Sequence, residues 1–104
     1  MIISKMFNLF LKSLFLYIFM NEKLEILKKK LLYRASYRGT KEMDILLSTF
    51  VKKHINKLNG KQLIELEDFL KFEDEVILDF YNFDIAKNEI EKNSISKIFK
   101  NFKM

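Results

Sequence analysis

The scarcity of residues that form turns limits the fold of this chain more than any other feature. It has no proline and only two glycines, Gly39 and Gly60, in 104 residues. A many-stranded β-sandwich needs a turn about every eight to twelve residues, and glycine and proline supply many of those turns. No stretch alternates with a period of two long enough for a convincing strand. The sequence therefore predicts an all-α fold, a small compact bundle of about five short helices around one core.

Apolar residues recur at helical spacing in five segments. We expect Asn21 to cap the first helix, a capping-box-like pair of Asn59 and Gln62 to open the third, and Asp74 to cap the fourth. The last helix is expected from about Ala86 to Phe102. The predicted core positions, helix by helix, are Leu24, Leu27, Leu31 and Ala35, with Ile26 and Leu32 widening the stripe; Met43, Leu46, Leu47, Phe50 and Leu58; Leu63, Leu66, Phe69 and Leu70; Ile77, Phe80 and Tyr81; and Ile90, Ile95, Ile98, Phe99 and Phe102.

The residue types that carry most enzyme chemistry are scarce. The chain has no cysteine, which excludes a disulfide framework, a cysteine-ligated zinc and a thiol nucleophile. His54 is the single histidine, and we assign it no role. The sequence contains no Walker loop, no GxGxxG, no HExxH and no EF-hand loop. We therefore predict that the chain is not an enzyme and has no catalytic, cofactor-binding or metal-binding residues.

Charge is distributed unevenly along the chain, whose net charge is +5. Residues 20–58 carry a net charge of +6, and residues 61–84 carry −6. This pattern suits complementary helix surfaces within one bundle. It also leaves open a small basic helical protein that binds nucleic acid, although such proteins usually show one basic face with interleaved aromatic residues. A bias toward residues with A/T-rich codons accounts for much of the lysine, so the net charge is weak evidence for an anionic partner.

The first 19 residues differ from the rest of the chain because they are apolar and contain no acid. A transmembrane helix needs about 20 apolar residues, and Lys12 interrupts this shorter stretch. A signal peptide needs a small-residue cleavage site, and Met20-Asn21-Glu22 offers none. A mitochondrial presequence should be rich in arginine, and this stretch contains none. We favour a translation start at Met20, then a presequence, then a membrane anchor. The expected organisation is an apolar extension over 1–19, without stable membrane insertion, and a single helical domain over 20–104.

The segment from Tyr37 to Asp44 lies where the first helical pattern breaks and the second begins. Gly39 at this junction can adopt a positive φ and lets another backbone approach closely. Glu42 falls in the first turn of the following helix, where the helix dipole favours a negative charge.

This segment resembles the succinate dehydrogenase assembly factors of the SdhE type. Their core sequence, Arg-Gly-x-x-Glu, stands here as Arg38-Gly39-Thr40-Lys41-Glu42, followed by Asp44. The resemblance extends over about residues 24 to 102, through 31–34 upstream and 45–50, 58–63 and 69–75 downstream. Tyr37 replaces a usual basic residue, and Thr40 and Phe80 replace a usual Met and Trp as packing residues.

The resemblance implies a chaperone that binds the flavoprotein subunit of succinate dehydrogenase (respiratory complex II, in the tricarboxylic acid cycle) or of fumarate reductase. As an FAD assembly factor it would promote protein flavinylation, the covalent attachment of FAD to that subunit. It would bind no cofactor stably, bind no nucleic acid, and be a monomer when free. Its location would be the cytoplasm in a bacterium, or the mitochondrial matrix if the source is eukaryotic.

The resemblance also implies a partner-binding site at the junction. Arg38 and Glu42 would offer charge-assisted hydrogen bonds, Gly39 would let the two backbones come close, and Lys41 and Asp44 would lie at the rim. We expect Gly39→Arg and Glu42→Ala to leave the fold near wild-type stability while binding is lost.

Overall fold

The computed structural model describes residues 2–104, with side chains described from Ser4 onward. The described residues form helices and no strand, so the all-α expectation is confirmed. In chain order the elements are α1 (Ile2–Ser36), α2 (Lys41–His54), the 3-10 helix η1 (Ile55–Lys57), α3 (Gly60–Leu70), α4 (Asp74–Phe83), the 3-10 helix η2 (Ile90–Lys92) and α5 (Ser94–Lys100).

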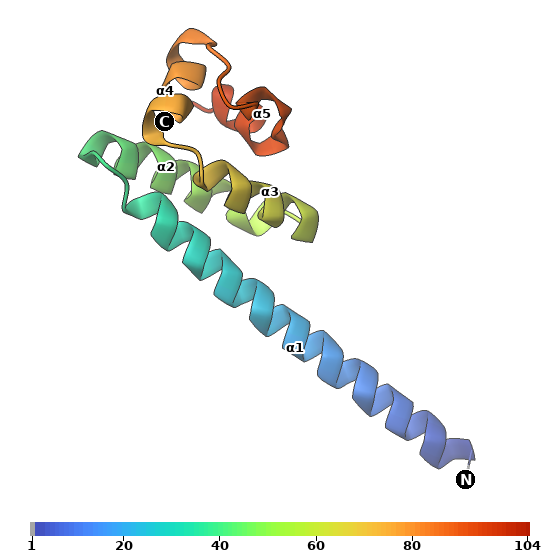
Figure 1. Ribbon diagram of the computed structural model, residues 1–104. Coiled ribbons are helices and arrows are strands. Elements are labelled where there is room, and N and C mark those ends of the chain that lie inside the picture. Colours follow the sequence, from blue (N-terminus) through green and yellow to red (C-terminus); the bar gives the residue numbers. More distant parts are fainter. Residues whose placement is uncertain (1) are drawn as a thin grey trace.

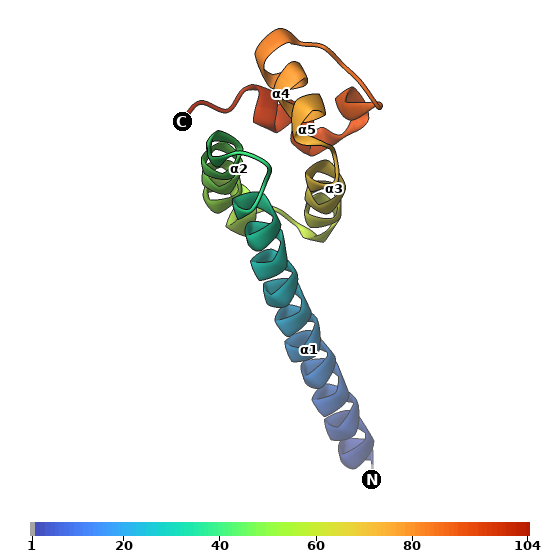
Figure 2. The same ribbon diagram turned by 60° about the vertical axis from the view of Figure 1, so that its left-hand side comes forward.

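The C-terminal part of α1 forms one side of the bundle, and its N-terminal part extends away from it (Figures 1 and 2). α2 and α3 pack against α1, and α5 packs against α3 and α4. Figure 2 shows α4 and α5 on the opposite side of α2 and α3 from the extended helix. The chain therefore measures 66 Å along its longest axis but only 25 and 20 Å across.

Three phenylalanines from three different helices form the centre of the core. Phe50 of α2, Phe69 of α3 and Phe99 of α5 are each at most 1% exposed. The ring centroid of Phe50 lies 5.0 Å from that of Phe99 and 6.3 Å from that of Phe69. Burying one such side chain contributes about 1.5–3 kcal/mol, so these contacts hold three helices together. The other buried apolar residues are Leu31, Ala35, Met43, Leu46, Leu47, Val51, Ile55, Leu63, Leu66, Leu70, Val76, Ile77, Phe80, Ile90, Ile95 and Phe102.

Most predicted core positions are confirmed, and two are wrong. Ile26 is 66% exposed, because it lies on the side of α1 that faces away from α2 and α3, and Ile98 is 36% exposed on the short α5. Val51, Ile55 and Val76 were not predicted and are buried.

The predicted first helix begins too late. α1 runs without a break from Ile2 through Asn21 to Ser36, so Asn21 is an exposed residue inside the helix rather than its cap. The physical reason is that no glycine or proline precedes Gly39, and nothing else in the segment disfavours helical backbone enough to end the helix. Leu24 is the first described apolar side chain to pack against the core.

The predicted last helix is too long. Asp84, Asn88 and Glu89 all have positive φ, so the chain from the end of α4 to η2 is irregular. Asn93 then caps α5, its side chain accepting hydrogen bonds from the backbone N–H groups of Ile95 (2.8 Å) and Ser96 (3.1 Å). Asparagine is a preferred N-cap residue, so the start of α5 had a local signal in the sequence.

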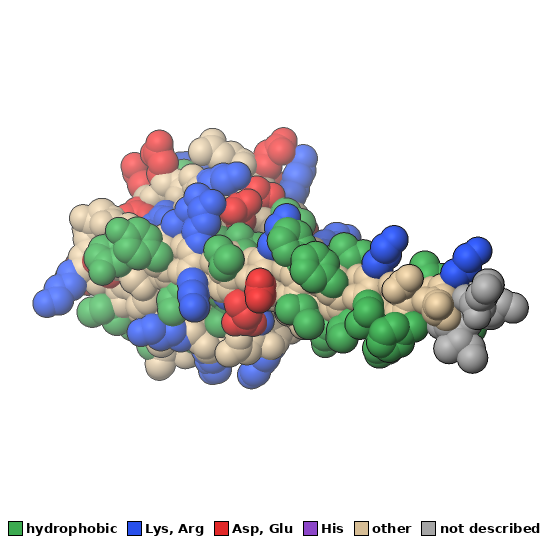
Figure 3. Space-filling model, turned by 90° about the horizontal axis from the view of Figure 1, so that it is seen from below, with side chains coloured by type: hydrophobic (Ala, Val, Ile, Leu, Met, Phe, Trp, Pro, Cys, Tyr) green, Lys and Arg blue, Asp and Glu red, His purple; other side chains and the backbone are tan. Residues whose placement is uncertain are grey.

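The part of α1 before Leu24 has apolar side chains on its surface, which Figure 3 shows around the projecting helix. Among the described residues, no helix is both long enough and apolar enough to cross a membrane. The boundary between residues 19 and 20 stays a prediction. The large apolar side chains exposed on this segment are Met6, Phe7, Leu9, Phe10, Leu11, Leu14, Phe15, Leu16, Tyr17, Ile18, Phe19 and Met20.

Candidate functional site

The junction between α1 and α2 is built by local hydrogen bonds. Thr40 has extended backbone geometry, and its hydroxyl oxygen accepts from the backbone N–H of Met43 at 3.2 Å, which caps α2. We had interpreted Thr40 as a packing residue, and this is wrong, because its side chain is exposed and serves as the cap. Phe80, the other replacement, is buried as expected.

Arg38 uses its guanidinium group to join the α1–α2 junction to the α3–α4 junction. Its Nη1 donates to the carbonyl of Leu70 and its Nη2 to the carbonyl of Phe72, both at 2.8 Å. Its Nε donates to Oδ1 of Asp74, also at 2.8 Å. The Arg38 side chain is only 11% exposed. One side chain therefore satisfies a carbonyl at the C-terminal end of α3, which the helix itself leaves unpaired, and forms an ion pair with α4.

Asp74 receives hydrogen bonds from two consecutive residues of the junction. Its Oδ1 accepts from Arg38, and its Oδ2 accepts from the backbone N–H of Gly39 at 2.8 Å. Asp74 is also the first residue of α4, where the helix dipole stabilises a carboxylate. The backbone N–H of Arg38 donates to Asp44 in the first turn of α2. We had predicted Asp74 as the cap of α4. Instead Glu73 occupies that position, without a side-chain cap, and Asp74 faces the junction.

Gly39 lies close to the carboxylate of Asp74. A Cβ atom added at this position would lie 3.0 Å from Oδ2 of Asp74. The φ angle of Gly39 is not positive. A longer side chain at this position would therefore first meet Asp74 of the protein itself. Whether it would also clash with a partner stays a prediction. The carboxylate that would be displaced belongs to this chain and is held by Arg38.

The structure divides the predicted partner-binding residues into two groups. Arg38, Gly39 and Asp44 make the internal contacts described above. Lys41 and Glu42 are exposed on the first turn of α2, and neither forms an ion pair within the part of the chain that the structure describes. The structure does not test whether any of these residues binds a partner, so that assignment stays a prediction. Asp74 was not predicted as part of this site, although it lies in the acidic run Glu73-Asp74-Glu75.

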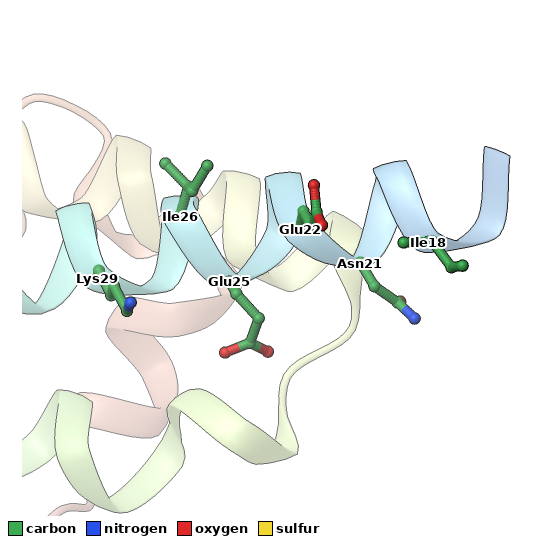
Figure 4. A pocket seen from close by; sticks show the side chains of 6 residues that line it. All are labelled: Ile18, Asn21, Glu22, Glu25, Ile26 and Lys29. Atoms are coloured by element: carbon green, nitrogen blue, oxygen red, sulfur yellow. The ribbon is translucent and has the colours of Figure 1, made fainter. Parts of the chain in front are cut away.

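A shallow pocket lies on α1, away from the junction. Figure 4 shows that all six side chains that line it come from this one helix. Within the described residues, no three histidine, cysteine, aspartate or glutamate side chains are placed to hold a metal ion. The pKa of Lys87 is raised by its hydrogen bond to Asp79 and by that carboxylate's charge, beyond the C-terminal end of α4 and away from the junction.

The fold and the junction define a small all-α domain. A polar network at Arg38 and Asp74 connects two inter-helix junctions of this domain. Residues 29–103 match the family model described as the flavinator of succinate dehydrogenase, and the chain belongs to this family.

Named relatives are mitochondrial proteins. Over 50 residues the chain is 46% identical to succinate dehydrogenase assembly factor 2-B, mitochondrial, of Drosophila simulans, and 44% identical to that of Drosophila melanogaster. It is 40% identical over 50 residues to assembly factor 2-A, mitochondrial, of Drosophila yakuba. Each match covers 48% of this chain and 31–32% of the relative, so only about a third of each relative's length is spanned. No solved structure matches the chain.

These comparisons confirm the family that the sequence resembles. The family match includes the entire junction and every helix of the bundle after the first part of α1. They give no support to the alternative of a nucleic-acid-binding protein.

Proposed function

We propose that this chain is an assembly factor that binds the flavoprotein subunit of succinate dehydrogenase, or of the related fumarate reductase, and promotes covalent attachment of FAD to that subunit. The observation that supports this most is the family match over residues 29–103, which covers the junction and its whole supporting core. The chain would not be an enzyme and would bind no cofactor stably. The new bond would form inside the flavoprotein, between its own histidine and the flavin 8α carbon, so the flavin supplies the chemistry.

The contribution of this chain would be binding energy directed at one conformation of the partner. A protein that binds a competent conformation more tightly than the others raises its population. The contacts of Arg38 with Asp74, Leu70 and Phe72 hold the α1–α2 junction against the C-terminal end of α3 and the start of α4. A surface held in this way loses little freedom on binding, which favours affinity. The first turn of α2 then presents Lys41 and Glu42 to the partner.

The names of the relatives also bear on location. They are described as mitochondrial. We propose the mitochondrial matrix as the site of action if the source is eukaryotic, and the cytoplasm if it is bacterial. The free chain is proposed to be a monomer.

The test is a flavinylation assay with the flavoprotein subunit from the same source. The subunit is expressed with wild-type chain, with Glu42→Ala, or with no assembly factor, and covalent flavin is read as in-gel fluorescence. We expect Glu42→Ala to lower covalent flavin while noncovalent FAD uptake persists. Because the chain contributes no chemical step, its effect should be stoichiometric rather than catalytic.

The matched control is Glu91→Ala. Glu91 is also an exposed glutamate, but it lies in η2 rather than at the junction. It should support flavinylation as wild type does. Equal covalent flavin with and without the wild-type chain would refute the proposed function. Normal flavinylation with Glu42→Ala would refute only the role of Glu42.

A further inference from the structure

A cleft of about 320 Å³ lies between the last turns of α1 and the end of α3. It is next to the junction, because Tyr37 forms part of its wall and directly precedes Arg38. Among the residues predicted for the partner-binding site, only Arg38 lines this cleft. The residues that line it are Tyr33, Arg34, Tyr37, Arg38, Leu70 and Lys71.

Two tyrosines form the aromatic part of the cleft. Tyr33 is 64% exposed and Tyr37 is 69% exposed, although both are large side chains near the C-terminal end of α1, which packs against the core. They lie one turn apart on α1, and their ring centroids are 4.6 Å apart. Tyrosine and arginine are the residue types enriched at the energetic centres of protein interfaces.

The charged residues that line the cleft are all basic. Arg38 is committed to its internal contacts, but Arg34 and Lys71 are not tightly paired. Nη1 of Arg34 contacts Glu67 at 3.5 Å, the outer limit of a hydrogen bond, and its side chain is 38% exposed. Nζ of Lys71 lies 3.7 Å from Asp68, and its side chain is 64% exposed. Both cations therefore remain available to an anionic group.

We propose that this cleft binds an acidic segment of the flavoprotein partner, with a carboxylate between Arg34 and Lys71 and an adjacent side chain against the two tyrosine rings. This proposal rests on the proposed function for the identity of the partner. Charge complementarity selects the occupant, because no acidic residue lines the cleft. Its volume is near the lower end of the range of about 300–1,000 Å³ for small-molecule pockets. A cleft of that size holds one or two side chains and does not enclose a dinucleotide such as FAD.

The experiment measures binding of the purified flavoprotein subunit to the full chain by calorimetry, at low and at physiological salt. The test variants are Lys71→Glu, which reverses a charge, and Tyr37→Ala, which removes a ring. Lys57→Glu is the charge control, because Lys57 is exposed and precedes α3, at the opposite end from Lys71. Phe83→Ala is the aromatic control, because Phe83 is exposed to the same 69% as Tyr37.

We expect each test variant to bind about tenfold more weakly or worse, and each control to stay within about threefold of wild type. The affinity of wild type should fall with salt more steeply than that of Lys71→Glu, because screening removes an attraction that this variant already lacks. A photo-crosslinker at position 37 should label a partner segment that contains aspartate or glutamate. Circular dichroism shows whether each variant is folded. If Tyr37→Ala does not fold, the binding of Lys71→Glu alone tests the proposal.

The outcomes separate this proposal from the proposed function. If the wild-type chain binds the subunit and both test variants bind equally well, the cleft proposal is overturned and the proposed function stands. If the wild-type chain does not bind the subunit, both are overturned. Crosslinks to a segment without acidic residues would overturn the acidic occupant.

Discussion

Replacing Asp74 with alanine tests how much the contact between the two inter-helix junctions stabilises the bundle. The substitution removes the acceptor for Nε of Arg38 and for the backbone N–H of Gly39, each at 2.8 Å. It also removes a carboxylate from the first residue of α4. Arg38 would keep its hydrogen bonds to Leu70 and Phe72 but lose its negatively charged partner.

The expected loss of stability follows from these contacts. A hydrogen bond that involves a charged group contributes about 1.5–3 kcal/mol, and a carboxylate at a helix N-terminus about 0.3–1 kcal/mol. Removing one partner of a fully buried ion pair costs about 3–5 kcal/mol. The pair here is partly exposed, with side-chain exposures of 11% for Arg38 and 25% for Asp74, so solvent reduces that cost. We therefore expect Asp74→Ala to lower the free energy of unfolding by about 2–4 kcal/mol.

Urea and thermal unfolding, followed by circular dichroism, measure this loss. For a domain of this size, 1 kcal/mol corresponds to a shift in Tm of about 4–8 °C, so a loss of about 2–4 kcal/mol should lower Tm by about 8–32 °C. Asp74→Asn keeps the shape of the side chain and an oxygen acceptor but not the charge, and it should cost roughly half as much. Asp68→Ala is the control, because Asp68 is exposed and lies 3.7 Å from its lysine partner; it should change stability by about 0.5 kcal/mol or less.

A Tm for Asp74→Ala within about 2 °C of wild type would refute this reasoning. It would mean that Arg38 holds the junction through the carbonyl groups of Leu70 and Phe72 alone. Equal losses for Asp74→Ala and Asp74→Asn would show that the charge of Asp74, rather than its shape, accounts for its contribution.

Three further predictions concern the same bundle and are measured by circular dichroism during unfolding. Gly39→Ala should cost about 1 kcal/mol because its Cβ presses on the Asp74 carboxylate, 3.0 Å away; an unchanged Tm would show that the carboxylate moves aside freely. Phe50→Ala and Leu66→Ala, both at residues 1% exposed, should each cost about 2–5 kcal/mol, and small losses for both would contradict the core assignment. A chain that starts at Met20 should fold with a Tm near that of the full chain, and a molten or aggregated product would show that the preceding helix stabilises the bundle.

Local signals in the sequence determined most of the secondary structure and the core. Helical spacing of apolar residues placed Phe50, Leu66 and Phe99 in the interior, and all three are at most 1% exposed. The predicted capping box at the start of α3 is confirmed, with reciprocal hydrogen bonds of 2.9 and 3.0 Å between Asn59 and Gln62. These features could be predicted because each depends on residues within one or two helical turns of each other.

Only the tertiary structure decided what the residues of the junction do. Asp74 lies 36 residues after Arg38, and their contact depends on how α3 and α4 pack beside α1. A hydrogen bond between residues so distant in sequence has no periodicity that would reveal it. Without that contact, Gly39 suggested conformational freedom or an approaching partner, whereas it makes room for a carboxylate of its own chain. The exposure of Ile26 could not be predicted from the sequence either, because the packing of α2 and α3 decides which face of α1 is buried.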